Sequence, residues 1–134
     1  MEITMISQNA DRDSFMTLKR WLENRNKNRT FIDFFHEYKY KNVAIYGAGD
    51  LGRLLYDEIK DSDIRVLYFV DRNAEGIGAV EGVPVITIRD IPFQEKVDVL
   101  VITPVGNYDE INKILIQSVP QLPTLSLREA VYEF

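Results

Sequence analysis

A β-type run that ends in a glycine-rich turn and leads directly into a helical pattern is the feature that most constrains the fold of this chain. The run Val43-Ala44-Ile45-Tyr46 is apolar without alternation, as buried parallel strands are. The next six residues, Gly47-Ala48-Gly49-Asp50-Leu51-Gly52, have the spacing G-x-G-x-x-G. A helix is predicted after them, at about residues 51–60. A strand, a glycine turn and a helix in this order favour an α/β fold.

The residues after this unit continue to alternate between strand and helix patterns. Strands are predicted at residues 65–70, 83–88, 97–103 and 123–126, and helices at 108–118 and 127–134. Residues 73–82 contain three glycines and are predicted to form an irregular loop. We therefore predict a Rossmann-like, doubly wound, mostly parallel sheet of about five strands.

Two helices are expected before this domain. The first ten residues read as an irregular start, and a helix follows at about residues 11–23. A second helix begins at Thr30 and carries an aromatic row at helical spacing: Phe31, Phe34, Phe35 and Tyr38. We divide the chain into an N-terminal helical extension, residues 1–40, and a nucleotide-binding domain, residues 41–134. The aromatic row is expected either to cover the sheet or to form a homodimer with a second copy.

Each glycine of the turn has a physical role in binding a nucleotide. Gly47 permits a sharp turn, Gly49 leaves room for a pyrophosphate, and Gly52 allows the helix to pack close to the sheet. The helix start offers free N–H groups and a positive dipole end to the phosphates. The other expected binding residues of this segment are Ala48, Asp50, Leu51 and Arg53. Arg53 is expected to reach a phosphate, and Asp50 to cap the helix. A tight turn without any ligand is the alternative.

Asp71 is the second candidate, 19 residues after Gly52 and at the end of a predicted strand. A carboxylate there accepts hydrogen bonds from ribose hydroxyls, which favours NAD over NADP, and Arg72 weakens this preference. A strand-end aspartate that faces water is the alternative. Thr103 and the backbone of Gly106 follow the strongest predicted strand, so we expect them to border the same crevice.

Composition excludes several other classes. The net charge of −5 argues against broad nucleic-acid binding. The absence of cysteine excludes thiolate nucleophiles and zinc–sulfur sites, and the one histidine, His36, is expected at the surface. No segment has the pattern of a signal peptide or a membrane span, so we expect a cytoplasmic protein without a membrane partner. We also expect no catalytic Tyr-x-x-x-Lys pair of the short-chain dehydrogenase kind.

Residues 41–134 resemble the Rossmann-type, CoA-binding-like NAD(P)-binding module of bacterial polysaccharide and nucleotide-sugar biosynthesis. The resemblance rests on 41–49 with Gly52-Arg53, on Tyr68-Phe69-Val70-Asp71-Arg72, on Gly82-Val83-Pro84-Val85 and on Asp98-Val99-Leu100-Val101-Ile102. It implies that Gly47, Gly49, Gly52 and Asp71 bind a dinucleotide, a nucleotide sugar or CoA.

The larger members of that family continue into a catalytic half where this sequence stops. The resemblance therefore favours a nucleotide-binding module that works alone or with a partner enzyme. A small oxidoreductase or nucleotide-sugar-modifying enzyme completed by a partner subunit is the alternative. The glycine run is also similar to that of the NADH-sensing domain of redox-responsive repressors, so a redox-sensing regulator is a third reading.

Overall fold

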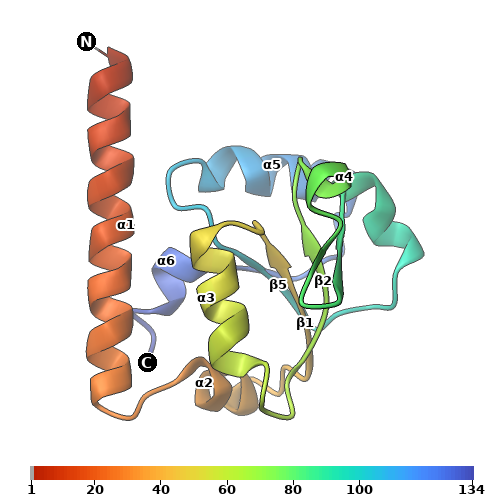
Figure 1. Ribbon diagram of the computed structural model, residues 1–134, viewed down its shortest axis with the longest axis horizontal. Coiled ribbons are helices and arrows are strands. Elements are labelled where there is room, and N and C mark those ends of the chain that lie inside the picture. The colour runs from red at the N-terminus through yellow and green to blue at the C-terminus, as the bar shows by residue number, and fades with distance from the viewer. Residues whose placement is uncertain (1) are drawn as a thin grey trace.

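The computed structural model describes residues 2–134, with side chains from residue 11 onward. The helices are α1 (Glu2–Asn26), α2 (Phe31–Glu37), α3 (Asp50–Ile59), α4 (Ala74–Ile77), the 3-10 helix η1 (Ile88–Phe93), α5 (Tyr108–Ser118) and α6 (Leu127–Ala130). The strands are β1 (Asn42–Tyr46), β2 (Arg65–Val70), β3 (Ala79–Val80), β4 (Val83–Ile86), β5 (Val99–Ile102) and β6 (Thr124–Ser126). The domain is thus of the α/β class, as predicted (Figure 1).

The six strands form one sheet in the order β3-β4-β2-β1-β5-β6. All neighbouring pairs are parallel except β3 and β4. β1 is central: Ile45 pairs with Phe69 of β2 on one side and with Val101 of β5 on the other. From β1 the chain continues to β2 and β4 on one side of the sheet, and later to β5 and β6 on the other. The loop after β1 and the loop after β5 therefore lead away from each other.

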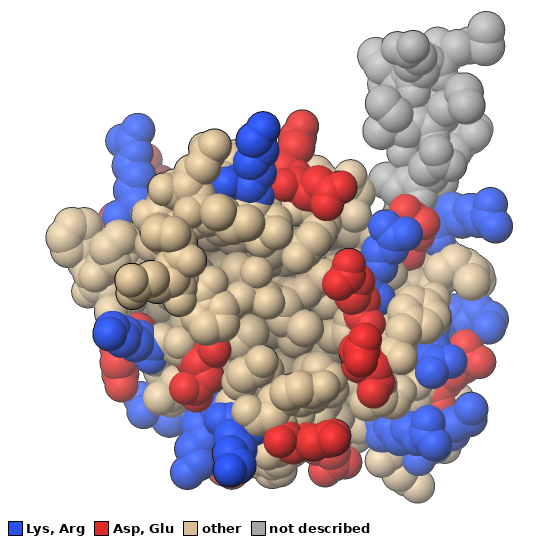
Figure 2. Space-filling model, turned by 180° about the vertical axis from the view of Figure 1, so that it is seen from behind, with Lys and Arg blue, Asp and Glu red and all other residues tan. Residues whose placement is uncertain are grey.

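Helices cover both faces of the sheet because the buried side chains of each central strand alternate between two apolar clusters. One cluster joins Ile45, Phe69 and Val101 to α2, α3 and α6. The other joins Tyr46, Val70 and Ile102 to η1 and α5. The central strands are consequently shielded from water on both sides, which explains their apolar sequences. Charged side chains lie instead on the outer surface, as the view from behind shows (Figure 2).

The aromatic row of α2 belongs to the first of these clusters. Thr30 caps the helix by accepting a hydrogen bond from the amide of Asp33, as its position predicted. Phe31, Phe34 and Phe35 are at most 4% exposed. Phe31 also packs edge to face on Trp21, with ring centroids 5.4 Å apart. These three rings are buried inside their own chain, so the expectation that the aromatic row covers the sheet is confirmed for them.

Several predicted boundaries differ from the structure. α1 is helical from Glu2, where an irregular start was expected, and α6 already ends at Ala130. Residues 73–82 are not an irregular loop: they contain α4 and the strand β3, which pairs with β4. Glu81 and Gly82 connect these strands with φ angles of 48° and 86°. Two consecutive positive φ angles define a type I′ hairpin, and a Glu-Gly pair is an uncommon sequence for it.

The 3-10 helix η1 was not expected either. Thr87 and Asp90 begin it with a reciprocal cap, in which both the amide and the hydroxyl of Thr87 donate to Oδ2 of Asp90. The spacing Thr-x-x-Asp is a recognisable helix-start signal, since the two side chains satisfy each other's backbone groups. Within the described residues no helix has the length and apolar character that crossing a bilayer requires.

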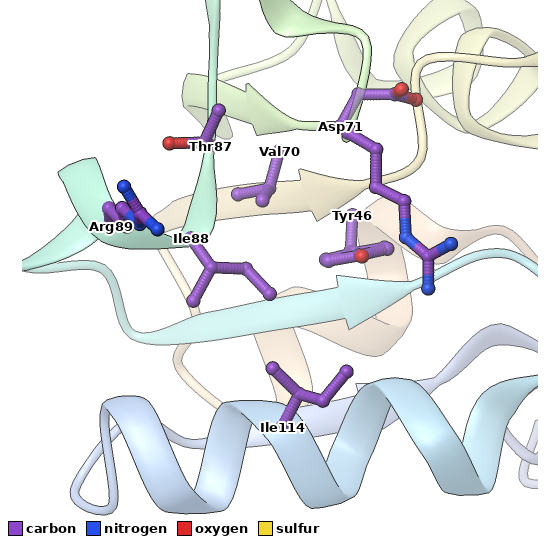
Figure 3. Close-up of a pocket in the computed structure, with 8 residues that line it drawn as sticks. Tyr46, Val70, Asp71, Thr87, Ile88, Arg89 and Ile114 are labelled. Atoms are coloured by element: carbon purple, nitrogen blue, oxygen red, sulfur yellow. The ribbon is translucent and has the colours of Figure 1, made fainter.

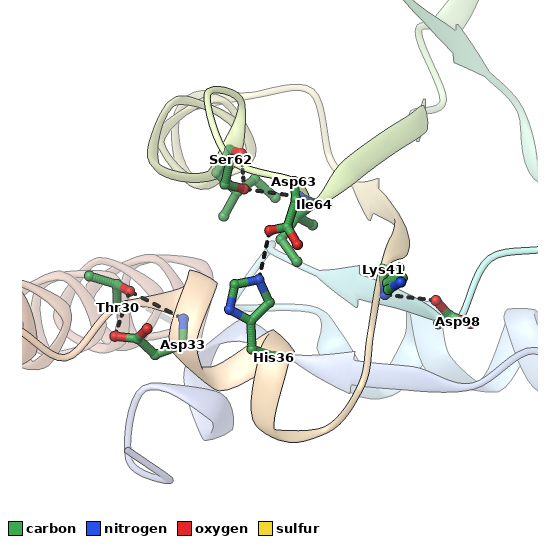
Figure 4. Close-up of polar contacts among 9 residues, drawn as sticks. Thr30, Asp33, His36, Lys41, Ser62, Asp63, Ile64 and Asp98 are labelled. Carbon is green, nitrogen blue, oxygen red and sulfur yellow. Dashed lines mark hydrogen bonds and ion pairs between the residues drawn. The ribbon is translucent and has the colours of Figure 1, made fainter.

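Polar contacts tie the amino ends of the strands to the N-terminal helices (Figure 4). His36 is exposed, as expected, and its Nε2 lies 2.6 Å from Oδ1 of Asp63. This contact lowers the pKa of the Asp63 carboxyl. The Asp98 carboxylate accepts hydrogen bonds from the amides of Lys41 and Asn42, at 2.8 and 2.9 Å. These contacts fix the position at which β1 begins.

Candidate functional site

The glycine turn connects the carboxyl end of β1 to the amino end of α3, as the sequence predicted. Gly47 has a φ of +99°, a conformation that residues with a Cβ rarely adopt. Its amide donates a 2.7 Å hydrogen bond to the carbonyl of Val70, which continues the β1–β2 pairing by one residue. The chain therefore leaves the sheet at the residue where the hydrogen bonds between β1 and β2 end.

Thr103 holds this turn through a hydrogen bond to the end of β1. Its hydroxyl donates to the carbonyl of Tyr46 at 2.7 Å, and the side chain is 2% exposed. A Cβ placed on Gly47 would lie 2.6 Å from this hydroxyl oxygen. Thr103 was expected to border the crevice, but its hydroxyl is buried and already bonded. Its hydroxyl holds the glycine turn in position.

Gly52 permits the close approach of α3 to the turn. A Cβ at this position would lie 1.8 Å from the carbonyl oxygen of Gly47 and 3.3 Å from Ile45. No real side chain tolerates the first of these distances, so residue 52 must be glycine for the helix to pack here. The protein's own packing thus accounts for both Gly47 and Gly52.

Gly49 differs from the other two glycines. Its φ is −92°, a value that any residue can adopt, and no heavy atom lies within 4 Å of a Cβ built there. Gly49 is the N-cap residue of α3, and no side chain caps the helix. Asp50 is the first residue inside the helix, so the expected capping by Asp50 is wrong. Among the described residues no side chain accepts a cap hydrogen bond from the first amides of α3, and the space beside Gly49 is open.

Two side chains tie the turn to its surroundings. Oδ2 of Asp71 accepts a 2.9 Å hydrogen bond from the amide of Ala48, and Oδ1 accepts one from the amide of Asn73. Nε of Arg53 donates to the carbonyl of Ala48 at 2.9 Å. The structure thus brings Ala48, Arg53 and Asp71 together, although each of the two side chains already binds the backbone. Leu51 is half-buried and packs against the first apolar cluster.

A cavity of about 360 Å³ adjoins Asp71 at the carboxyl ends of β1, β2 and β4 (Figure 3). Its apolar lining residues are Tyr46, Val70, Ile88 and Ile114, and its polar ones are Asp71, Arg72, Thr87 and Arg89. Figure 3 shows Tyr46, Val70 and Ile88 on one side of this space, and Ile114 of α5 opposite them. Two arginines and one aspartate give the cavity a net positive charge, in a chain whose overall charge is −5.

Tyr46 contributes a phenol to the lining of this cavity. Burial raises its pKa, and the neighbouring positive charge of Arg72 acts in the opposite direction. The phenol therefore stays neutral at physiological pH and can donate or accept a hydrogen bond.

A second cavity lies at the carboxyl ends of β5 and β6. Its volume is about 660 Å³, and Gly106 lines it together with Asn107, Tyr108 and Ser126. Gly106 therefore borders a crevice as expected, but this crevice is separate from the one beside Asp71. Four carboxylates and one arginine line it: Asp13, Asp109, Glu110, Glu129 and Arg128. The two cavities consequently have opposite charge.

Sequence reasoning missed Tyr46, Arg89 and Ile114 as cavity residues. The signal for Arg89 was available, because parallel strands end at one edge of the sheet and β4 neighbours β2. Tyr46 was read only as the last strand residue. Ile114 could not be found, since the sequence does not say which turn of α5 faces the sheet edge.

Tyr56 and Lys60 do have the spacing Tyr-x-x-x-Lys, which our sequence reading had excluded. The pair lies at the carboxyl end of α3, whereas the glycine turn is at its amino end. Nζ of Lys60 contacts Glu81 at 3.3 Å and Asp57 at 3.4 Å. The pair is therefore remote from both cavities at the carboxyl ends of the strands, and Lys60 is neutralised by carboxylates.

These features define an α/β domain with a glycine turn and a cationic cavity at the same edge of a parallel sheet. Residues 39–120 match the family model described as C2185-like, N-terminal, and the chain belongs to this family. The matched region contains β1 to α5, and so includes the turn and every residue that lines the cationic cavity. The description of the family states no ligand and no reaction. No curated protein and no solved structure matches the chain.

Proposed function

We propose that this domain binds a nucleotide, with the phosphates at the glycine turn and the nucleoside in the cationic cavity. The observation that carries the proposal is the open space at Gly49. Gly47 is required by its φ and Gly52 by a backbone contact, but no described residue requires residue 49 to lack a side chain. Room for a phosphate beside the uncapped start of α3 is a physical reason for it.

The cavity beside Asp71 supports a nucleoside as the neighbouring group. Tyr46, Ile88 and Ile114 offer apolar surface to a flat base, and about 360 Å³ is within the usual range of ligand pockets. The Asp71 oxygens each accept one backbone hydrogen bond, and each retains a lone pair for a ribose hydroxyl. The strand order around β1, with helices on both faces, supports a Rossmann-like fold, in which ligands bind at this edge.

The ligand class proposed is an NAD(P)-type dinucleotide or a nucleotide sugar, with CoA as a further member of the same chemistry. Asp71 favours a free 2′-hydroxyl, as in NAD, whereas Arg72 and Arg89 favour an additional phosphate, as in NADP. The acidic second cavity offers carboxylates to sugar hydroxyls or to an oxidised nicotinamide. A role in polysaccharide or nucleotide-sugar synthesis is consistent with this chemistry.

Thermal unfolding and calorimetry with NAD, NADH, NADP, a UDP-sugar and CoA test the proposal. A ligand at 100 times its dissociation constant stabilises the folded state by about 2.7 kcal/mol. We expect at least one of these compounds to raise the unfolding temperature. The absence of any shift at millimolar concentration would contradict the proposal.

The variant Gly49→Asp separates binding from folding. Aspartate is a better N-cap than glycine by a few tenths of a kcal/mol, and no neighbour obstructs its side chain. The free energy of unfolding should therefore stay within about 0.5 kcal/mol of the wild-type value. The carboxylate would occupy and repel the phosphate site, so ligand affinity should fall at least tenfold. If the variant bound the ligand as tightly as the wild type does, the phosphates would not bind at Gly49.

A further inference from the structure

The outer face of α1 carries a row of apolar side chains that nothing in the described residues covers. Phe15, Leu18 and Leu22 are 63%, 38% and 60% exposed. Their spacing of three and four residues places them on one side of the helix. Figure 1 shows α1 at the side of the molecule, with its amino-terminal turns extending beyond the other helices. We call these three residues the α1 row.

The opposite side of α1 packs against the domain, so the helix is firmly attached. Thr17, Trp21 and Asn24 are at most 5% exposed. The side-chain amide of Asn24 donates to the carbonyl of Val131 at 2.7 Å, and the indole N–H of Trp21 donates to Glu58 at 3.0 Å. The α1 row therefore stays partly exposed while the helix itself is held in place.

Opposite charges stand at the two ends of the α1 row. Asp11 precedes Phe15 by four residues and Arg25 follows Leu22 by three, which continues the same heptad spacing. Arg25 is 55% exposed, and only its Nε is bonded, to Glu58 at 3.2 Å. The row thus has an acidic end and a basic end with apolar residues between them.

We propose that the α1 row is the contact surface of an antiparallel homodimer. With Leu18 on the two-fold axis, Phe15 of one chain packs against Leu22 of the other, and Asp11 faces Arg25. This surface is complementary to itself, as a two-fold interface must be. A parallel pair would instead place Asp11 against Asp11, which is repulsive, and would leave neither carboxylate a basic partner. The charge order along the helix therefore selects the antiparallel arrangement.

Sedimentation of the full chain between about 5 and 500 μM tests the proposal. The mass should rise from the 15.6 kDa of one chain toward twice that value as the concentration increases. Leu18→Glu places two carboxylates at the two-fold axis and should keep the protein monomeric at every concentration. Met16→Glu is the matched control, because Met16 is 41% exposed but lies on another side of α1. A wild-type monomer at all concentrations would overturn the proposal, as would a dimer that Leu18→Glu leaves intact.

Cysteine cross-linking tests the orientation, since the natural sequence has no cysteine. A mixture of Phe15→Cys and Leu22→Cys chains should form a mixed disulfide in far higher yield than Phe15→Cys alone. Preferential cross-linking of Phe15→Cys to itself would indicate a parallel pair and overturn the antiparallel register. All substituted positions are exposed, so circular dichroism should show the wild-type fold. The proposal does not depend on nucleotide binding, and each can fail without the other.

Discussion

A Cβ on Gly52 would lie 1.8 Å from the carbonyl oxygen of Gly47. The first turn of α3 therefore rests directly on the backbone that leaves β1, without any side chain between them. Gly52 is required by this contact and Gly47 by its φ of +99°, whereas a Cβ on the third glycine, Gly49, would meet no other atom. This contrast predicts different effects of the same substitution at two positions.

Gly52→Ala should destabilise the protein, and Gly49→Ala should not. The added methyl group at residue 52 must displace either the turn or α3, which costs about 2–3 kcal/mol of unfolding free energy. The same group at residue 49 meets no atom within 4 Å and should change that free energy by less than about 1 kcal/mol. Urea denaturation of both variants measures the difference. Equal stabilities would show that the helix does not rest on the turn.

Asp71→Asn should loosen the glycine turn. An asparagine has one acceptor oxygen, so its NH₂ group would face one of the two amides that Asp71 now accepts, those of Ala48 and Asn73. We expect a loss of about 1–2 kcal/mol in unfolding free energy and faster hydrogen exchange at the Ala48 amide. Arg72→Ala is the control, since Arg72 is exposed and should leave that amide protected. Unchanged exchange in Asp71→Asn would contradict this account.

Glu58→Gln should weaken the attachment of the N-terminal helices. The Glu58 side chain is 2% exposed and accepts hydrogen bonds from the indole of Trp21 and from the amide of Phe31, at 3.0 and 2.7 Å. Glutamine would turn a donor toward one of them, at a cost of about 2 kcal/mol. Trp21 is the only tryptophan, so its fluorescence reports this change directly.

Asp57→Asn is the matched control for Glu58→Gln. Asp57 is the preceding residue, 56% exposed, and contacts Lys60 at 3.4 Å. An exposed ion pair of this kind contributes little, so this variant should stay within about 0.5 kcal/mol of wild type. If the two variants were equally stable, Glu58 would not be the anchor that its contacts indicate.

Stability should fall at high pH because of Tyr68. Burial raises the pKa of this phenol from 10.0 to about 12. Its neutral form is therefore favoured in the folded state, and the resulting stability is present below pH 10 and is lost as the pH rises toward 12. At pH 11 the expected loss is on the order of 1 kcal/mol relative to pH 8.

Tyr68→Phe should remove this pH dependence. The Tyr68 hydroxyl makes no hydrogen bond to another described residue and reaches a surface cavity, so the variant should match the wild type within about 0.5 kcal/mol at pH 8. At pH 11 the variant should be the more stable of the two. Urea denaturation of both proteins at pH 8 and pH 11 measures this difference in unfolding free energy. If both proteins lost the same unfolding free energy between pH 8 and pH 11, the loss would be due to groups other than Tyr68.

The sheet was predictable because its strands are apolar and its turns carry glycine, proline or aspartate. β2 and α5 have the predicted boundaries, and β1 differs by one residue. The hairpin at Glu81-Gly82 was not predictable, because glutamate is not a residue type that favours the positive φ angle it adopts there. The glycine turn could be located from its spacing. The roles of Thr103 and Arg53 could not, since both depend on which backbone carbonyl lies within reach once the chain has folded.

The edges of the sheet have a consequence for solubility. β3 has two residues and β6 has three, so neither border offers more than a few unpaired backbone groups to another chain. Strands this short are poor templates for strand addition, which is how edge-to-edge aggregation and amyloid growth begin. Concentrated solutions of this protein should accordingly resist the formation of β-rich fibrils.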